Sequence, residues 1–253
     1  MKTYMDLCTR YYDLDKPKAP AGALSFYLEY AKNANGAIFE PMCGTGRFLI
    51  PILEQGFDIE GADASPHMLA VCRERCKSRK LNPELYQQFI QEMALQKRYA
   101  LIFIPSNSFG LIIDAEAAKS SLKILGDHLL PDGKLVFEIE TVRGVPADLG
   151  RSQVKYVDDK NGERISLTTL SSYHKEDQVL QTICDYKLSR NDRTVRSETE
   201  DFRVRLYQYS EIGGWLKEAG FKKVSLYGDY NRRPSKAEDE MVICECARSA
   251  LVS

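Results

Sequence analysis

The turn that follows the first apolar strand constrains the fold of this chain more than any other stretch of its sequence does. Residues 37–40 (Ala-Ile-Phe-Glu) predict a short strand, and residues 41–46 (Pro-Met-Cys-Gly-Thr-Gly) a turn with two glycines. Residues 47–55 have the apolar density of a buried helix, in which Pro51 predicts a bend because it lacks a backbone donor. Glycines let backbone approach a ligand closely, and a helix start offers free N–H groups. We therefore predict a ligand site at this turn.

Strand and helix patterns alternate along the rest of the chain. Strands are expected at 58–63, 86–90, 99–104 and 134–139, helices at 24–32, 66–80, 114–129 and 210–219, and two closing strands at 223–227 and 240–246. Strands that alternate with helices at this spacing form a parallel sheet with helices on both faces. The predicted fold class is α/β, a Rossmann-like, doubly wound and mostly parallel sheet of seven strands.

The pattern changes after residue 140. Three β-rich stretches joined by polar turns are expected at 164–173, 178–189 and 194–207. Such runs indicate an antiparallel meander with one solvent-exposed face. We therefore divide the chain into a ligand-binding domain, residues 1–140 and 207–253, and a β-rich insertion, residues 141–206, which is the expected lid and specificity element.

Composition excludes several classes of protein. Lys plus Arg total 35 and Asp plus Glu total 36, so the formal charge of −1 argues against a nucleic-acid binder. No apolar run approaches the ~20 residues that span a bilayer, and no secretory signal follows Met1. The seven cysteines are scattered, without paired C-x-x-C motifs, and only three histidines occur. We expect a cytoplasmic protein with free thiols and no metal site.

Asp63 ends the strand that follows the glycine turn. A carboxylate at this place can accept hydrogen bonds from both hydroxyls of a ribose. The alternative is that Asp63 caps the helix beginning near Pro66, a role that Ser65 can fill. The agreement of strand end, glycine turn and spacing favours the ribose.

Two nucleoside ligands compete for such a site. A dinucleotide fingerprint has a third glycine, where this chain has Leu49, and a pyrophosphate would face the carboxylate of Glu40. A ligand that carries a sulfonium and an ammonium would instead be attracted by Glu40. Electrostatics therefore favours S-adenosylmethionine over a dinucleotide.

At this point the sequence resembles the class I S-adenosylmethionine-dependent methyltransferases. The resemblance rests on E-P-M-C-G-T-G at 40–46, G-A-D-A-S-P-H-M-L at 61–69, I-Q-E-M at 90–93, L-P-D-G-K-L-V-F-E at 130–138, and the stretch 209–221, which ends in A-G-F. The β-rich insertion is similar to that of small-molecule N-methyltransferases of the glycine and amino-sugar type.

The resemblance implies roles for individual residues. The cofactor-binding residues would be Tyr12, Glu40, Met42, Gly44, Gly46, Asp63, Ala64, Met68, Glu92, Met93 and Pro105. Ala64 and Met68 would flank the adenine, Glu92 would reach its amino group, and Met93 would pack on the ring. Tyr12, with Tyr11 before it, falls where the family often places an aromatic lid.

The catalytic candidates are Asn107, Tyr209 and His174. A neutral amine needs no strong base before it attacks a sulfonium, whereas a hydroxyl usually does. His174 is either such a base, if the insertion folds over the site, or a surface residue. We expect methyl transfer to a small-molecule acceptor, with nitrogen as one candidate atom. The alternatives are a nicotinamide-dependent oxidoreductase and a catalytically silent cofactor-binding or dimerisation module, and a homodimer is left open.

Overall fold

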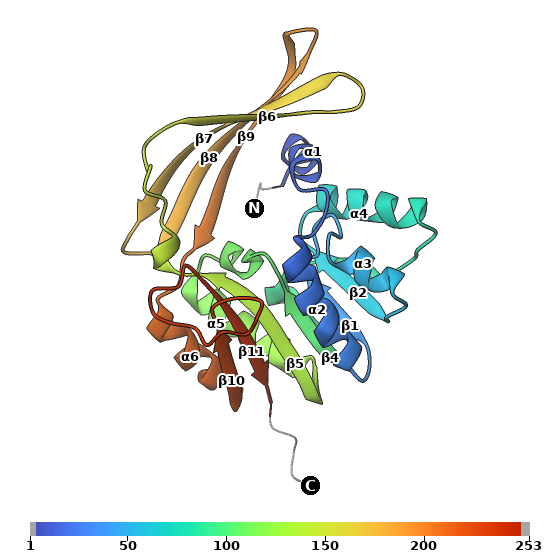
Figure 1. Ribbon diagram of the computed structural model, residues 1–253, viewed down its shortest axis with the longest axis vertical. Coiled ribbons are helices and arrows are strands. Elements are labelled where there is room, and N and C mark those ends of the chain that lie inside the picture. Colours follow the sequence, from blue (N-terminus) through green and yellow to red (C-terminus); the bar gives the residue numbers. More distant parts are fainter. Residues whose placement is uncertain (1–3, 249–253) are drawn as a thin grey trace.

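Seven strands form the central sheet in a computed structural model, which describes residues 4–248 (Figure 1). The strands are β1 (Ile38–Pro41), β2 (Ile59–Asp63), β3 (Leu85–Gln87), β4 (Tyr99–Ile104), β5 (Leu129–Glu140), β10 (Lys223–Tyr227) and β11 (Met241–Ala247). Their order is β10-β11-β5-β4-β1-β2-β3. β11 runs antiparallel to β10 and β5 on its two sides, and the other neighbouring strands are parallel. The predicted mostly parallel sheet is confirmed.

Helices cover both faces of this sheet, because its central strands carry apolar side chains on both sides. The helices are α2 (Ala21–Asn33), α3 (Leu49–Glu54) and α4 (Pro66–Ser78) on one face, and α5 (Ala115–Asp127) and α6 (Tyr209–Glu218) on the other. In β1, Ile38 packs in the first of these layers and Phe39 in the second. The sheet therefore lies between two apolar cores.

Local signals set the starts of the helices around the glycine turn. Ser65 caps α4 by accepting the backbone N–H of Met68 at 3.2 Å, and Pro66 is the first helical residue, as expected. The helix after the turn begins later than expected, at Leu49, so Pro51 lies in its first turn. The missing donor of Pro51 therefore removes no helical hydrogen bond, and the expected bend has no cause there.

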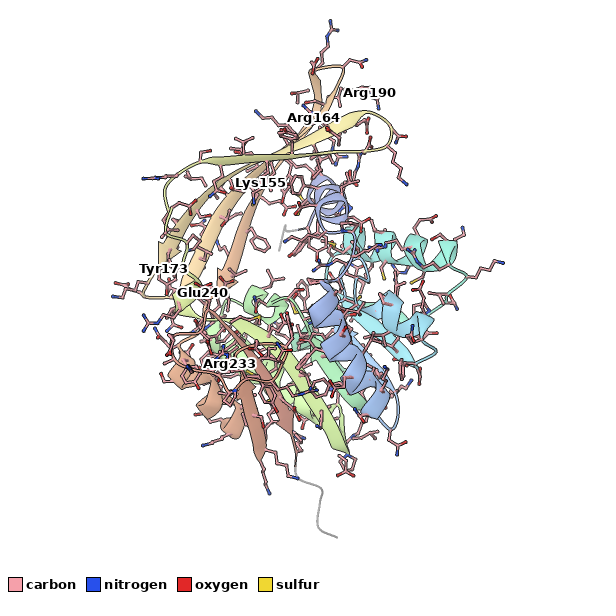
Figure 2. All side chains as sticks on the ribbon, viewed as in Figure 1. Lys155, Arg164, Tyr173, Arg190, Arg233 and Glu240 are labelled. Atoms are coloured by element: carbon pink, nitrogen blue, oxygen red, sulfur yellow. The ribbon has the colours of Figure 1, made fainter. Side chains whose placement is uncertain are left out.

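A second, antiparallel sheet extends from the end of β5 (Figure 1). It consists of β6 (Gln153–Asp158), β7 (Glu163–His174), β8 (Val179–Arg190) and β9 (Arg193–Arg205), paired in this order. The three expected β-rich stretches correspond to β7, β8 and β9, whereas β6 was not expected. Tyr173 lies at the end of this sheet near the main sheet, and Arg164 and Arg190 lie at the far end (Figure 2).

Helix α1 (Asp6–Asp15) was also missed by the sequence analysis. It packs on the second sheet, not on the main one: Leu7, Cys8 and Tyr11 form an apolar cluster with residues of β7 and β8, among them Ile165 and Tyr186. Its N-cap is Met5, whose side chain makes no capping bond. The only local sign of the start of this helix is the acidic residue Asp6 in its first turn.

The cysteines pack in the cores: all seven are buried and free. Within residues 4–248, no group of three or more His, Cys, Asp or Glu is placed to hold a metal ion. No helix in the same part of the chain is long and apolar enough to cross a membrane.

Gly61 of β2 provides a test of how tightly the sheet packs beneath the glycine turn. A Cβ at this position would lie 2.5 Å from Leu49 Cδ1 and 3.0 Å from Cys43 Sγ. We expect Gly61→Ala to lower the free energy of unfolding by about 1–3 kcal/mol through overpacking, measured by urea denaturation. The control is Gly214→Ala in α6, where a Cβ meets no atom within 4 Å. This change should be neutral or stabilising, and equal stabilities of the two variants would contradict the prediction.

Candidate active site

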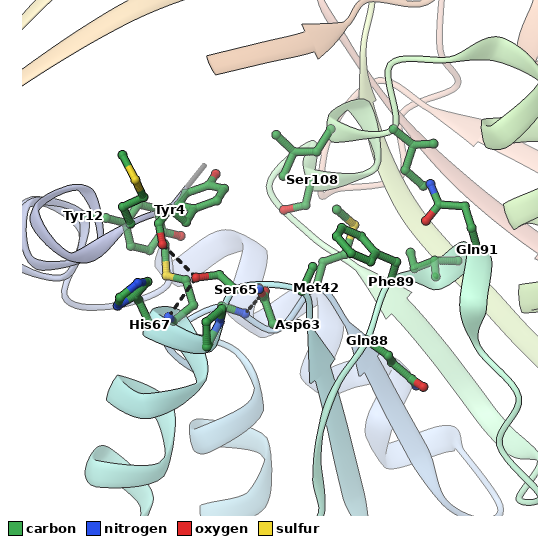
Figure 3. Close-up of a pocket in the computed structure, with 18 of the residues that line it drawn as sticks. Tyr4, Tyr12, Met42, Asp63, Ser65, His67, Gln88, Phe89, Gln91 and Ser108 are labelled. Carbon is green, nitrogen blue, oxygen red and sulfur yellow. Dashed lines mark hydrogen bonds between the residues drawn. The ribbon is translucent and has the colours of Figure 1, made fainter. Parts of the chain in front are cut away.

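A cavity of about 420 Å³ opens at the carboxyl ends of the central strands (Figure 3). It is lined by Tyr4, Met5, Tyr12, Met42, Gly44, Asp63, Ala64, Ser65, Pro66, His67, Met68, Gln88, Phe89, Ile90, Gln91, Ser108, Leu111, Ile112 and Ile113. Asp63 ends β2, three of these residues lie in or just before the first helix, Asp6–Asp15, and the others follow β1, β2, β3 or β4. In open α/β sheets this edge, where the strand order reverses, is where ligands bind.

Asp63 is fixed at the tip of β2 by two backbone donors. Its Oδ2 accepts the N–H of Gly44, and its Oδ1 accepts the N–H of Ser65, both at 2.8 Å. Burial raises the pKa of Asp63, although these two donors favour the charged form. Each carboxylate oxygen can accept a further hydrogen bond, so Asp63 can serve hydroxyl donors from the cavity. The helix cap is Ser65, and Asp63 is left to line the cavity.

Glu40 is a buried carboxylate within β1, 1% exposed. The backbone N–H of Leu49 faces it, but its Oε2 has no hydrogen-bond partner among the described residues. Burial raises the pKa of Glu40 well above its ordinary value, and the guanidinium of Arg47 only partly opposes this shift. Glu40 and Gly46 do not line the cavity themselves, but Glu40 lies within electrostatic range of Asp63 and Tyr12, which do.

Arg47 was missed by the sequence analysis. Its side chain is buried, one terminal nitrogen lies 3.2 Å from Ser106 Oγ, and its Nε has no partner within the described part of the chain. The guanidinium carbon lies 5.0 Å from the ring centroid of Tyr12. The only sequence signal was a cation directly after the glycine turn. Unpartnered polar atoms of both signs, buried in one place, favour a zwitterionic ligand group.

The chain after β3 contributes different residues from those expected. Ala64 and Met68 line the cavity, but Glu92 is exposed and Met93 is buried in the core, and neither lines it. β3 ends at Gln87, and the chain then turns into the 3₁₀ helix Ile90–Glu92, so residues 88–91 face the cavity instead. Figure 3 shows Phe89, 39% exposed, with its ring at this wall.

Only one residue of the expected tyrosine lid faces the cavity. Tyr12 lines it, together with Tyr4, whose ring lies edge-on at 6.2 Å (Figure 3). Tyr11 points the other way, into the second sheet, with its ring 5.7 Å from that of Tyr186. The helical twist of α1 separates the two side chains, and the sequence could not decide which face of the helix covers the cavity.

The turn after β4 has a strained backbone. Ser106 and Asn107 both have positive φ angles, of 60° and 56°. The Ser106 N–H donates to Glu138 Oε2 at 2.8 Å, and Tyr27 Oη donates to Glu138 Oε1 at 2.8 Å. This anchoring holds Asn107 in a conformation that few residues adopt. Asn107 Oδ1 is buried, with no hydrogen-bond partner in residues 4–248, and the next residue, Ser108, lines the cavity.

The other candidates lie apart from the cavity. Pro105 does not line it, and its carbonyl accepts the Ser108 hydroxyl at 2.9 Å. Tyr209 Oη lies 3.2 Å from the carbonyl oxygen of Ser235. His174 is exposed at the end of β7, with Nε2 2.9 Å from Gln181 Oε1. The structure thus gives His174 and Tyr209 no contact with the cavity.

A Rossmann-like sheet with a cavity at the carboxyl ends of its strands is the fold that the resemblance of the sequence implies. Residues 38–133 match the methyltransferase domain family. The chain is 24% identical over 225 residues to the glycine/sarcosine N-methyltransferase of Halorhodospira halochloris, covering 86% of this chain and 77% of that protein. It is 23% identical over 186 residues to the dTDP-3-amino-3,6-dideoxy-α-D-glucopyranose N,N-dimethyltransferase of Streptomyces fradiae, covering 73% and 69%.

A solved structure shares the fold over almost the whole chain. It is a S-adenosylmethionine-dependent methyltransferase from Clostridium acetobutylicum, with a TM-score of 0.78 at 19% identity, covering 95% of this chain and 96% of that one. These comparisons support a class I S-adenosylmethionine-dependent methyltransferase, the family that the sequence resembles. The predicted enzyme class and cofactor are confirmed, and the nicotinamide-dependent alternative is set aside.

The unpartnered carboxylate of Glu40 predicts a trade-off between stability and binding. Since the folded pKa of Glu40 lies above the ordinary value of 4.5, the unfolded chain ionises first as pH rises. The ligand-free protein therefore loses stability as the pH rises above 4.5, because the unfolded chain releases a proton that buried Glu40 retains. We expect Glu40→Gln to raise the free energy of unfolding at pH 7 by about 1–3 kcal/mol, with no gain at pH 4, measured by urea denaturation at both pH values.

The control for this prediction is a partnered carboxylate. Glu60 of β2 is buried, and its Oε2 accepts the hydroxyl of Tyr99 at 2.8 Å, while Lys97 forms an ion pair with its Oε1. Glu60→Gln should destabilise the protein at pH 7, because it removes the charge that Lys97 and Tyr99 contact. A loss of stability in both variants would show that Glu40 has a partner after all.

Proposed function

We propose that this methyltransferase transfers the methyl group of S-adenosylmethionine to a nitrogen atom of a small-molecule acceptor. Support for the donor site comes from the buried charges near the glycine turn. An ammonium group would satisfy Glu40 Oε2, and a carboxylate would satisfy Arg47 Nε, both of which lack partners in the described chain. The methionine end of the cofactor carries one group of each kind, so the residues present fit it.

The rest of the cavity suits the nucleoside end of the cofactor. Asp63 would accept hydrogen bonds from the ribose hydroxyls, since two backbone donors already fix its orientation. Met68 and Phe89 offer apolar surface for the adenine ring. Gln88 also lines the cavity, and its Nε2 is a buried donor without a partner in residues 4–248. In this proposal residues 88–91 replace Glu92 and Met93.

The sulfonium of the bound cofactor supplies the methyl group, so the work left to the protein is to align the acceptor and to exclude water. Asn107 carries the argument for nitrogen. Its Oδ1 is a buried hydrogen-bond acceptor without a donor in the described structure, and the backbone around it is held by Glu138. An amine N–H would donate to Oδ1 and thereby orient the nitrogen lone pair away from it. A neutral amine also needs no base, and His174 is exposed elsewhere.

The second sheet supplies a surface for the remainder of the acceptor. Phe202, Thr182 and Ser171 are neighbours on one face of the sheet, and Ser171 Oγ lies 2.9 Å from Thr182 Oγ1. Phe202 continues this face to the cavity, because its ring lies 5.8 Å from that of Tyr4. A face of hydroxyls and aromatic carbon favours a small polar acceptor over a polyanion. The curated relatives named above act on an amino sugar nucleotide and on glycine or sarcosine.

The ribose assignment is tested by Asp63→Ala. We expect the Kd for S-adenosylhomocysteine, measured by isothermal titration calorimetry, to rise about tenfold or more, because charge-assisted hydrogen bonds are lost. Asp58→Ala is the matched control, since Asp58 lies at the other end of the same strand, exposed and paired with Lys97 at 3.2 Å. An unchanged Kd for Asp63→Ala would remove Asp63 from the cofactor site.

The acceptor atom is tested by product formation. Purified protein and S-adenosylmethionine are incubated with amino sugars, amino sugar nucleotides, glycine and sarcosine, each beside its hydroxyl analogue, and S-adenosylhomocysteine is quantified. We expect turnover with an amine and none with the matched alcohol. With that amine, Asn107→Ala should lower kcat about 10- to 100-fold, through misplacement of the acceptor, and leave the Kd for S-adenosylhomocysteine unchanged. Preferential turnover of alcohols would contradict the proposal.

A further inference from the structure

Glu200 is a buried carboxylate of β9, far in the sequence from the residues it contacts. Its Oε2 accepts the N–H of Tyr4 at 3.0 Å, and its Oε1 accepts the N–H of Met5 at 2.7 Å. Glu198 Oε2 accepts the N–H of Leu7, also at 2.7 Å. These backbone groups begin α1, where a helix has unpaired N–H groups and a partial positive charge. Two carboxylates of the insertion thus take the place of the cap that Met5 does not provide.

The same segment is also bonded to the cofactor cavity. The hydroxyl of Ser65 donates to the carbonyl oxygen of Tyr4 at 2.8 Å, and the N–H of Ser65 donates to Asp63 at 2.8 Å (Figure 3). Tyr4 and Met5 themselves line the cavity. The peptide group between these two residues therefore connects β9 of the insertion to the tip of β2.

The two attachments of α1 differ in kind. Toward the insertion, Leu7, Cys8 and Tyr11 are buried in an apolar cluster. Toward the main domain, α1 makes polar contacts, among them the ion pair of Asp13 with Arg75 at 2.8 Å and the stacking of Tyr12 with Arg47. Since apolar burial is harder to break than partly exposed polar contacts, α1 will separate from the main domain before it separates from the insertion.

We propose that Glu200 is a positioning residue. Its hydrogen bonds to the N–H groups of Tyr4 and Met5, here called the latch, tie α1 to the insertion above the cofactor cavity, so that α1 and the insertion open and close as one body. This inference rests on the proposed cofactor site. Tyr4, Met5 and Tyr12 form one wall of that site, so the cofactor enters and leaves when the latched segment moves away. In this proposal the hydrogen bonds of the latch form whether or not the cofactor is bound. Weakening the latch therefore changes how fast the cofactor exchanges more than how tightly it binds.

The test compares the full-length wild type with Glu200→Gln. Gln keeps the shape of Glu200 but removes its charge and places an amide donor against one of the two N–H groups. Association and dissociation rates of isotopically labelled S-adenosylhomocysteine are measured by rapid filtration. We expect both rates to rise about tenfold, with the Kd changing less than about twofold. Unchanged rates, or a faster dissociation alone with a matching rise in Kd, would overturn the latch.

Asp201→Asn is the matched control. Asp201 is the next residue of β9, points to the opposite face, and is exposed and paired with Arg203 at 2.6 Å. The Asp201→Asn variant should bind and release S-adenosylhomocysteine at the rates of the wild type. If the wild type does not bind S-adenosylhomocysteine at all, the proposed cofactor site fails. If it binds normally and Glu200→Gln exchanges at the same rates, only the latch fails.

A second measurement covers the case in which Glu200→Gln does not fold. Amide hydrogen exchange of the wild type reports the N–H groups of Met5 and Leu7 directly. We expect both to exchange slowly, with little change on adding S-adenosylhomocysteine, because in the proposal they stay hydrogen-bonded to carboxylates of the insertion whether α1 is open or closed. Fast exchange of these two groups, unaffected by the ligand, would overturn the proposal.

Discussion

Asp63 is held at the tip of β2 by two backbone N–H groups, and one of them, that of Gly44, belongs to the turn after the neighbouring strand. This contact joins the two parallel strands at their carboxyl ends. It fixes the conformation of the glycine turn, in which Gly44 has a φ of +56°. The cavity and its lining depend on this geometry, because residues after β1 and β2 form its floor.

Stability and binding are opposed around this contact. Glu40 and Arg47 are buried with unpartnered atoms in the described chain, an arrangement that destabilises a folded protein unless a ligand completes it. Asn107, which we propose to contact the acceptor, also has an unpartnered buried atom in the described chain, in a turn that Glu138 holds at positive φ. Binding of the methyl donor and the methyl acceptor would therefore supply hydrogen-bond partners for polar groups that folding leaves buried and unpaired.

The insertion extends the site beyond the common sheet. Its β9 supplies Glu198 and Glu200 to the start of α1. Tyr12 of α1, and Tyr4 just before this helix, line the cavity. A segment at the beginning of the chain and a strand near residue 200 thus act on the same wall of the cavity. We propose that the sheet shared with other methyltransferases fixes the cofactor and that this additional sheet decides what can lie beside it.

The sequence by itself determined the parallel sheet, the glycine turn and Asp63, because these follow from short-range patterns of apolar residues, glycines and helix caps. Tertiary structure decided which polar groups remain unpartnered, as for Arg47, and which face of α1 meets the cavity, as for Tyr12 rather than Tyr11. It also brought residues 88–91 to the cavity wall in place of Glu92, because β3 ends earlier than the sequence predicts. Such outcomes depend on contacts between residues far apart in the chain, and no local pattern encodes them.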